Sequence, residues 1–113
     1  MTTVPDYRFD QPANVQTVTP AMYRARAERL VHAGGDWSPA MDLTLMEALG
    51  RGEGLDKAAK GLAVPMVEAR ARFFAIQRAM TTREYLPMDA QAALLAVLRE
   101  AVAVVSFKSR RVN

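Results

Sequence analysis

The sequence predicts an all-α domain of about five helices, and three kinds of observation support this. Thr19-Pro20 and Ser38-Pro39 each place a capping hydroxyl before a proline, an arrangement that favours a helix start. Apolar residues recur every three to four positions after both starts. Glycines at Gly34-Gly35 and within residues 50–54 then tolerate the positive φ angles at which helices end.

The N-terminal third of the chain contains an arm and two helices. Two prolines and no sustained apolar period predict a flexible arm over residues 1–18. A single helical domain is predicted over 19–106, and its first helix, at about 20–33, is amphipathic with an arginine-rich flank. The second helix is predicted at about 39–50, because four apolar residues there share helical spacing: Met41, Leu45, Met46 and Leu49.

Proline and glycine divide the middle of the chain into two further helices. The segment 55–62 is long enough for only two turns. Proline disfavours α geometry in the residue before it, so Val64 is predicted as a junction and Pro65 as the start of a fourth helix. That helix should continue to about Met80.

The last predicted helix is hydrophobic. Asp89 can cap a helix that continues to about Ser106 and is apolar around almost its whole circumference. Such a helix must be covered on several sides, so it either closes the core or forms a homodimer through residues 89–106. The β-branched run 102–105 leaves open a short strand at its end. Residues 107–113 are predicted to form a basic C-terminal tail.

The composition excludes several classes of function. The 113-residue chain has no cysteine, which excludes disulfides, thiolate zinc sites and cysteine nucleophiles. His32 is the only histidine and has no accompanying carboxylate motif, so neither a metal site nor a catalytic triad is expected. The glycine-rich stretch 50–54 lacks both the preceding strand and the lysine of a phosphate-binding loop. We therefore expect no enzyme activity and no cofactor.

The start of the chain and its apolar runs bear on localisation. No basic segment followed by an apolar stretch opens the sequence, and no apolar run approaches the roughly 18–20 residues of a membrane span. A cytoplasmic protein without membrane association is expected. Twelve of the fifteen basic residues are arginine, a bias that GC-rich coding produces and that favours a bacterial or phage origin.

Positive charge is concentrated in the C-terminal half. Residues 1–64 carry seven basic and eight acidic residues, a net charge of −1, whereas residues 65–113 carry eight basic and four acidic residues, a net charge of +4. Basic surfaces suit partners that carry phosphate groups.

The most informative stretch, residues 38–80, has the pattern of a helix-turn-helix. A short helix, a three-residue turn and a longer helix follow one another. Ala59 can be the small residue where the helices approach, and Leu62 and Val64 can lock their crossing. Ala63 occupies the turn position that is often glycine. The helix from Pro65 would then enter the major groove, which is wide enough for one α-helix.

Residues 37–80 also resemble a known family. The matching features are Trp37-Ser38-Pro39, Leu45, Leu49, Glu53-Gly54-Leu55 and Ala58-Ala59-x-x-Leu62-Ala63-Val64 before a basic helix. These resemble GcrA-type bacterial regulators and, more loosely, Myb-like and sigma-factor region 4 modules. The resemblance implies that the third helix of the unit binds promoter DNA, and that the chain engages the sigma subunit of RNA polymerase. The reading helix departs from these families at Met66-Val67-Glu68, where they usually place small polar or basic residues.

Together these patterns predict a small helix-turn-helix transcriptional regulator that binds double-stranded DNA. The predicted DNA-binding residues are Lys57, Lys60, Met66, Arg70, Arg72, Gln77, Arg78, Arg110 and Arg111. An alternative is an adapter that binds RNA polymerase or another protein, which the apolar Met66-Val67 pair and Glu68 favour. The helix arginines would otherwise be only a solvated face.

Overall fold

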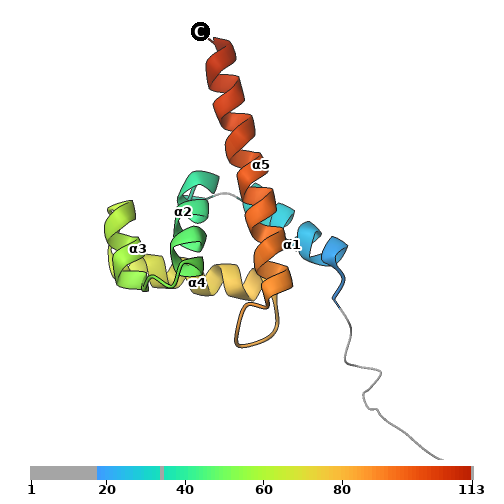
Figure 1. Ribbon diagram of the computed structural model, residues 1–113, viewed down its shortest axis with the longest axis vertical. Helices are drawn as coiled ribbons and strands as arrows, with labels where there is room; N and C mark the ends of the chain where they lie inside the picture. The colour runs from blue at the N-terminus through green and yellow to red at the C-terminus, as the bar shows by residue number, and fades with distance from the viewer. Residues whose placement is uncertain (1–17, 34, 113) are drawn as a thin grey trace, which may run out of the picture.

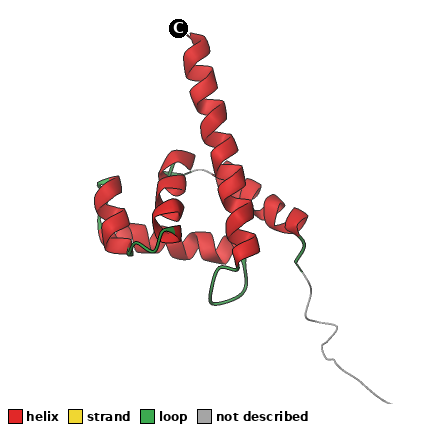
Figure 2. Cartoon of the chain, viewed as in Figure 1, coloured by secondary structure: helices red, strands yellow, loops and turns green. Residues whose placement is uncertain are grey.

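A computed structural model describes residues 18–33 and 35–112, with side chains described as far as Val105. The predicted flexible arm lies almost wholly outside these residues. The described residues form five helices and no strand, which confirms the predicted all-α class (Figures 1 and 2). The helices are α1 (Pro20–Ala33), α2 (Pro39–Gly50), α3 (Leu55–Leu62), α4 (Met66–Met80) and α5 (Met88–Val112).

The predicted capping chemistry is present at the first two helix starts. The hydroxyl oxygen of Thr19 accepts a hydrogen bond from the backbone N–H of Met22, and Ser38 accepts one from Met41, both at 3.2 Å. Each bond satisfies an N–H group that lacks a partner within its own helix. Pro65 is the N-cap of α4 rather than its first residue, so α4 begins one position later than predicted.

Helix α5 differs from its prediction at the C-terminal end. The sequence predicts an end at about residue 106 followed by a basic tail, but α5 continues to Val112 and contains residues 102–105 as helix. The sequence after residue 106 has no glycine or proline to stop the helix.

The hydrophobic core lies where α1, α2 and α4 meet the first half of α5. In Figure 1, α4 crosses the base of the molecule, α1 and α2 flank α5, and α3 lies on the side away from α1. The largest fully buried apolar side chains are Leu45, Met46, Ile76, Met80, Leu94 and Leu98. The first half of α5 is therefore part of the core of a single chain.

Ion pairs at the surface supplement this packing. Arg24 of α1 forms a bidentate hydrogen-bonded pair with Glu100 of α5, and this hydrogen bonding lowers the pKa of Glu100. Arg99 of α5 pairs with Glu47 of α2 at 3.1 Å. Exposed pairs of this kind contribute little to stability. Burial of the apolar side chains must hold the helices together.

The turn between α3 and α4 is tightly defined. Ala63 has φ 58° and ψ 41°, the left-handed conformation. Its N–H donates to the carbonyl of Lys60, and the N–H of Val64 donates to the carbonyl of Ala59, both at 3.1 Å. This pair of bonds is the Schellman arrangement, in which glycine is the usual left-handed residue. The turn therefore has a fixed geometry, although its left-handed position carries a side chain.

Local conformational preferences at this turn give a testable prediction. Gly61 lies within α3, and a β-carbon there would meet nothing within 4 Å. Gly61→Ala should stabilise the domain by about 0.5–1 kcal/mol, because glycine loses more backbone entropy in a helix. Ala63→Gly should also stabilise it, by up to about 1 kcal/mol, because glycine is not strained at this φ. Urea denaturation followed by circular dichroism measures both, and destabilisation by Ala63→Gly would contradict the turn geometry.

Candidate functional site

One side of α4 is buried and the opposite side faces solvent. Ala69, Ile76 and Met80 are buried against the rest of the domain. The residues on the opposite side are exposed at helical spacing: Val67, Arg70, Ala71, Phe74 and Arg78. We call these five residues the outer face of α4. It combines an apolar strip with two arginines.

Arg72 is turned away from the outer face and bound to Asp42 of α2. Its Nε and Nη2 donate to the two carboxylate oxygens of Asp42 at 2.8 and 2.6 Å. Only 2% of the Asp42 side chain and 14% of the Arg72 side chain are exposed. The guanidinium is therefore committed to joining α2 and α4, and we remove Arg72 from the predicted DNA-binding residues. This partner was not predictable from the sequence, because Asp42 lies 30 positions away and on another helix.

The other predicted residues of the α3–α4 region are accessible. Lys57 and Lys60 are exposed on α3, which packs against α4. Met66, Arg70 and Arg78 are exposed on α4.

Gln77 has a structural contact of its own. This half-buried residue donates from Nε2 to the carbonyl oxygen of Arg83 at 3.3 Å. The bond joins α4 to the connection that leads to α5.

Arg110 and Arg111 lie far from α4. Both belong to α5, whose C-terminal end projects away from α4 (Figure 1). From Met88 to Arg110 the helix rises by about 33 Å, at roughly 1.5 Å per residue. Their side chains are outside the described residues. The structure thus does not bring these two arginines to the α3–α4 side of the molecule.

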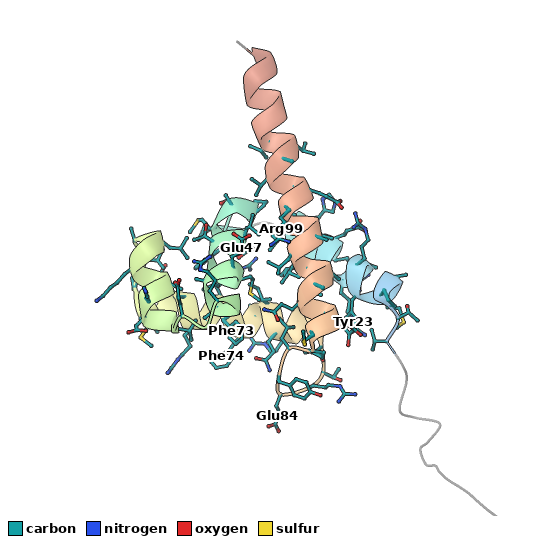
Figure 3. The ribbon with its side chains drawn as sticks, viewed as in Figure 1. Tyr23, Glu47, Phe73, Phe74, Glu84 and Arg99 are labelled. Atoms are coloured by element: carbon teal, nitrogen blue, oxygen red, sulfur yellow. The ribbon has the colours of Figure 1, made fainter. Side chains whose placement is uncertain are left out.

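Sequence reasoning missed the exposure of Phe74. The rings of Phe73 and Phe74 lie 6.1 Å apart (Figure 3), but Phe73 packs against the core whereas Phe74 is exposed. Adjacent helical residues point about 100° apart, so two successive phenylalanines cannot both face one core. The adjacency of the two phenylalanines was therefore the sequence signal that one of them is exposed.

The connection between α4 and α5 carries a second exposed aromatic residue. Tyr85 accepts a hydrogen bond at 3.1 Å from the guanidinium of Arg83, which also lies 5.8 Å from the centre of the tyrosine ring. Because Gln77 binds the backbone of Arg83, this pair lies beside the C-terminal half of α4. The sequence offered no periodic pattern that would have singled it out.

The described residues contain neither a metal-binding cluster nor a membrane-spanning helix. Within residues 18–33 and 35–112, no group of three histidine or acidic side chains is placed to hold a metal ion. None of the helices there is long and apolar enough to span a membrane. Comparison with protein-family models, curated proteins and solved structures finds no match to this chain. The outer face of α4 and its surroundings are therefore the candidate functional site.

Proposed function

We propose that this chain is a small helix-turn-helix protein that binds double-stranded DNA and regulates transcription in a bacterium or phage. The turn at Ala63 carries the proposal. Its left-handed residue and paired hydrogen bonds set the direction of α4 relative to α3, and Ala59 of α3 is buried, as the small residue at a close helix crossing is expected to be. The same turn leaves the outer face of α4 open to solvent.

The start of α4 suits an approach to DNA. Met66, Val67 and Arg70 are all exposed and together line a shallow depression. The N-terminal end of a helix carries a partial positive charge that attracts phosphate groups. Arg70 can donate two hydrogen bonds to a guanine edge or bind a phosphate, and the apolar residues can contact a thymine methyl group.

Basic residues on α3 and along α4 supply the phosphate contacts. Lys57 and Lys60 on α3 and Arg78 on α4 are exposed, and no acidic residue lies within α4 except Glu68. Glu68 can accept from the amino group of cytosine but repels phosphates, which favours weak binding with some base preference. Such binding should depend strongly on salt concentration.

Fluorescence anisotropy of a labelled random-sequence duplex tests the proposal. With four phosphate contacts, from Lys57, Lys60, Arg70 and Arg78, the logarithm of the binding constant should fall with the logarithm of salt concentration with a slope of about −3 to −4. Absence of binding at low salt, or a slope near zero, would contradict DNA binding by this surface.

Binding to a protein is the second candidate function. Val67 and Phe74 are exposed apolar side chains on the outer face of α4, and Met66 extends the same strip. Exposed aromatic and methionine side chains of this kind suit a groove in another protein, such as RNA polymerase or its sigma subunit. In this case the helix-turn-helix serves as a scaffold.

A further inference from the structure

The loop between α4 and α5, residues 81–87, lies on the same side of the molecule as the outer face of α4. In Figure 1 it extends beyond α4, at the opposite end of the molecule from the C-terminus of α5. Figure 3 places Phe74, on the outer face, and Glu84, at the tip of the loop, at the same lower edge. A ligand that covers the outer face of α4 can therefore also reach this loop.

Hydrogen bonds fix the backbone of the loop around Arg83. Thr81 is buried, and its hydroxyl oxygen accepts from the backbone N–H of Arg83 at 3.1 Å. The N–H of Thr81 itself donates to the carbonyl of Gln77 at 2.9 Å. The side-chain amide of Gln77 donates in turn to the carbonyl of Arg83 at 3.3 Å. Both backbone polar groups of Arg83 are thus held against the end of α4, which gives its side chain a fixed starting position.

The side chains of Arg83 and Tyr85 together present hydrogen-bond donors to solvent. The guanidinium donates to the hydroxyl oxygen of Tyr85 at 3.1 Å and lies 5.8 Å from the centre of its ring. A guanidinium has five N–H groups, and a tyrosine hydroxyl that accepts one hydrogen bond can still donate its own proton. Among residues 18–33 and 35–105, no acidic side chain forms an ion pair with Arg83.

We propose that Arg83 and Tyr85 bind a phosphate of the DNA backbone that flanks the groove entered by α4. This inference rests on the proposed function and adds a second contact region to it. From Met66 to Met80, α4 spans about 21 Å at roughly 1.5 Å per residue. The major groove is only roughly 12 Å wide. When the first turns of α4 occupy the groove, its other end and the adjoining loop therefore lie over the flanking backbone.

The chemistry of the pair favours a phosphate. Arginine and tyrosine side chains are common phosphate ligands, and such contacts fix the position of a protein on the duplex. The guanidinium can bind two phosphate oxygens in parallel, and the adjacent hydroxyl can donate to the same group. The contacts with Tyr85 hold the guanidinium before binding, so less side-chain freedom is lost on association. Glu84 acts in the opposite direction, because its carboxylate at the loop tip repels phosphate.

The salt dependence of duplex binding, measured by fluorescence anisotropy, tests the loop separately from α4. The loop adds one phosphate contact to those from α3 and α4, so Arg83→Ala should make the slope shallower by about 0.9. Arg83→Lys keeps the charge and should keep the slope. Arg29→Ala is the matched control, because it removes the same charge from an exposed position on α1 and should leave the slope unchanged.

Two uncharged replacements test the neighbours of Arg83. Tyr85→Phe should lower the affinity about threefold to tenfold at an unchanged slope, because it removes one hydrogen-bond donor and no charge. Glu84→Gln should raise the affinity at low salt, because it removes a carboxylate from beside the phosphate, and this gain should fade at high salt. Circular dichroism checks that each variant folds.

These variants separate failure of the loop contact from failure of the proposed function. If the double variant of the exposed α4 arginines weakens binding but Arg83→Ala and Tyr85→Phe bind like the wild type, α4 contacts DNA and the loop does not. That result overturns this inference alone. Absence of duplex binding by the wild type overturns the proposed function and this inference with it. An equal change of slope in Arg83→Ala and Arg29→Ala would show an effect of net charge only, and would also overturn the loop contact.

Discussion

Replacing Asp42 with alanine is expected to lower the free energy of unfolding by about 3–5 kcal/mol, because it leaves the charge of Arg72 inside the domain without its partner. Both hydrogen bonds of the guanidinium to the carboxylate, at 2.8 and 2.6 Å, would be lost. Small domains have a total stability of only about 5–15 kcal/mol, so this change removes a large share of it. Urea denaturation followed by far-ultraviolet circular dichroism measures the loss.

A double replacement tests whether the stability lost in Asp42→Ala comes from the unpaired charge of Arg72 or from the change at position 42 itself. Asp42→Leu with Arg72→Met removes both charges while keeping similar volume, and should recover most of the stability lost in Asp42→Ala. Arg99→Ala is the matched control, since the exposed pair of Arg99 with Glu47 should contribute less than about 1 kcal/mol. A loss below about 1 kcal/mol in Asp42→Ala would show that the buried pair does not join α2 to α4 as described.

The local features of the fold were predictable from short stretches of sequence. Thr19 and Ser38 identified the starts of α1 and α2, because a helix cap depends on residues within one turn of each other. The helix-turn-helix pattern placed Ala63 at the turn position that is often glycine, and the structure gives this residue the left-handed conformation. The end of α5 was placed too early, because the sequence there has no signal that stops a helix.

Features that depend on distant residues were not predictable in the same way. From sequence alone, a basic residue on a helix is interpreted as part of a charged, solvent-exposed face. The ion pair of Arg72 could not be predicted in this way, because its partner lies on α2. The prediction that Arg110 and Arg111 bind DNA together with α4 is not supported by the structure. It could not be checked from the sequence, because the direction of α5 relative to α4 depends on the packing of the whole core. The split of α5 into a buried and a projecting half has the same origin, since it reflects where the other helices end.

Removing two arginines from the outer face of α4 is expected to have the largest effect on DNA binding. Arg70→Ala with Arg78→Ala should reduce the steepness of the salt dependence by about 2, because each lost phosphate contact reduces it by about 1. Affinity at low salt should fall by about tenfold to a thousandfold, depending on whether Arg70 also contacts a base edge. Stability should change little, since both side chains are exposed.

The control variant removes the same charge from another part of the surface. Arg29→Ala with Arg99→Ala, on α1 and α5, changes the net charge equally but should leave the salt dependence close to that of the wild type. Phe74→Ser separates the two candidate functions, because it removes exposed apolar surface without altering charge. If DNA affinity is unchanged in the Arg70 and Arg78 variant, α4 does not contact DNA. If Phe74→Ser in addition abolishes binding to RNA polymerase, the outer face of α4 is a protein-binding surface, since only contact with an apolar groove requires that ring.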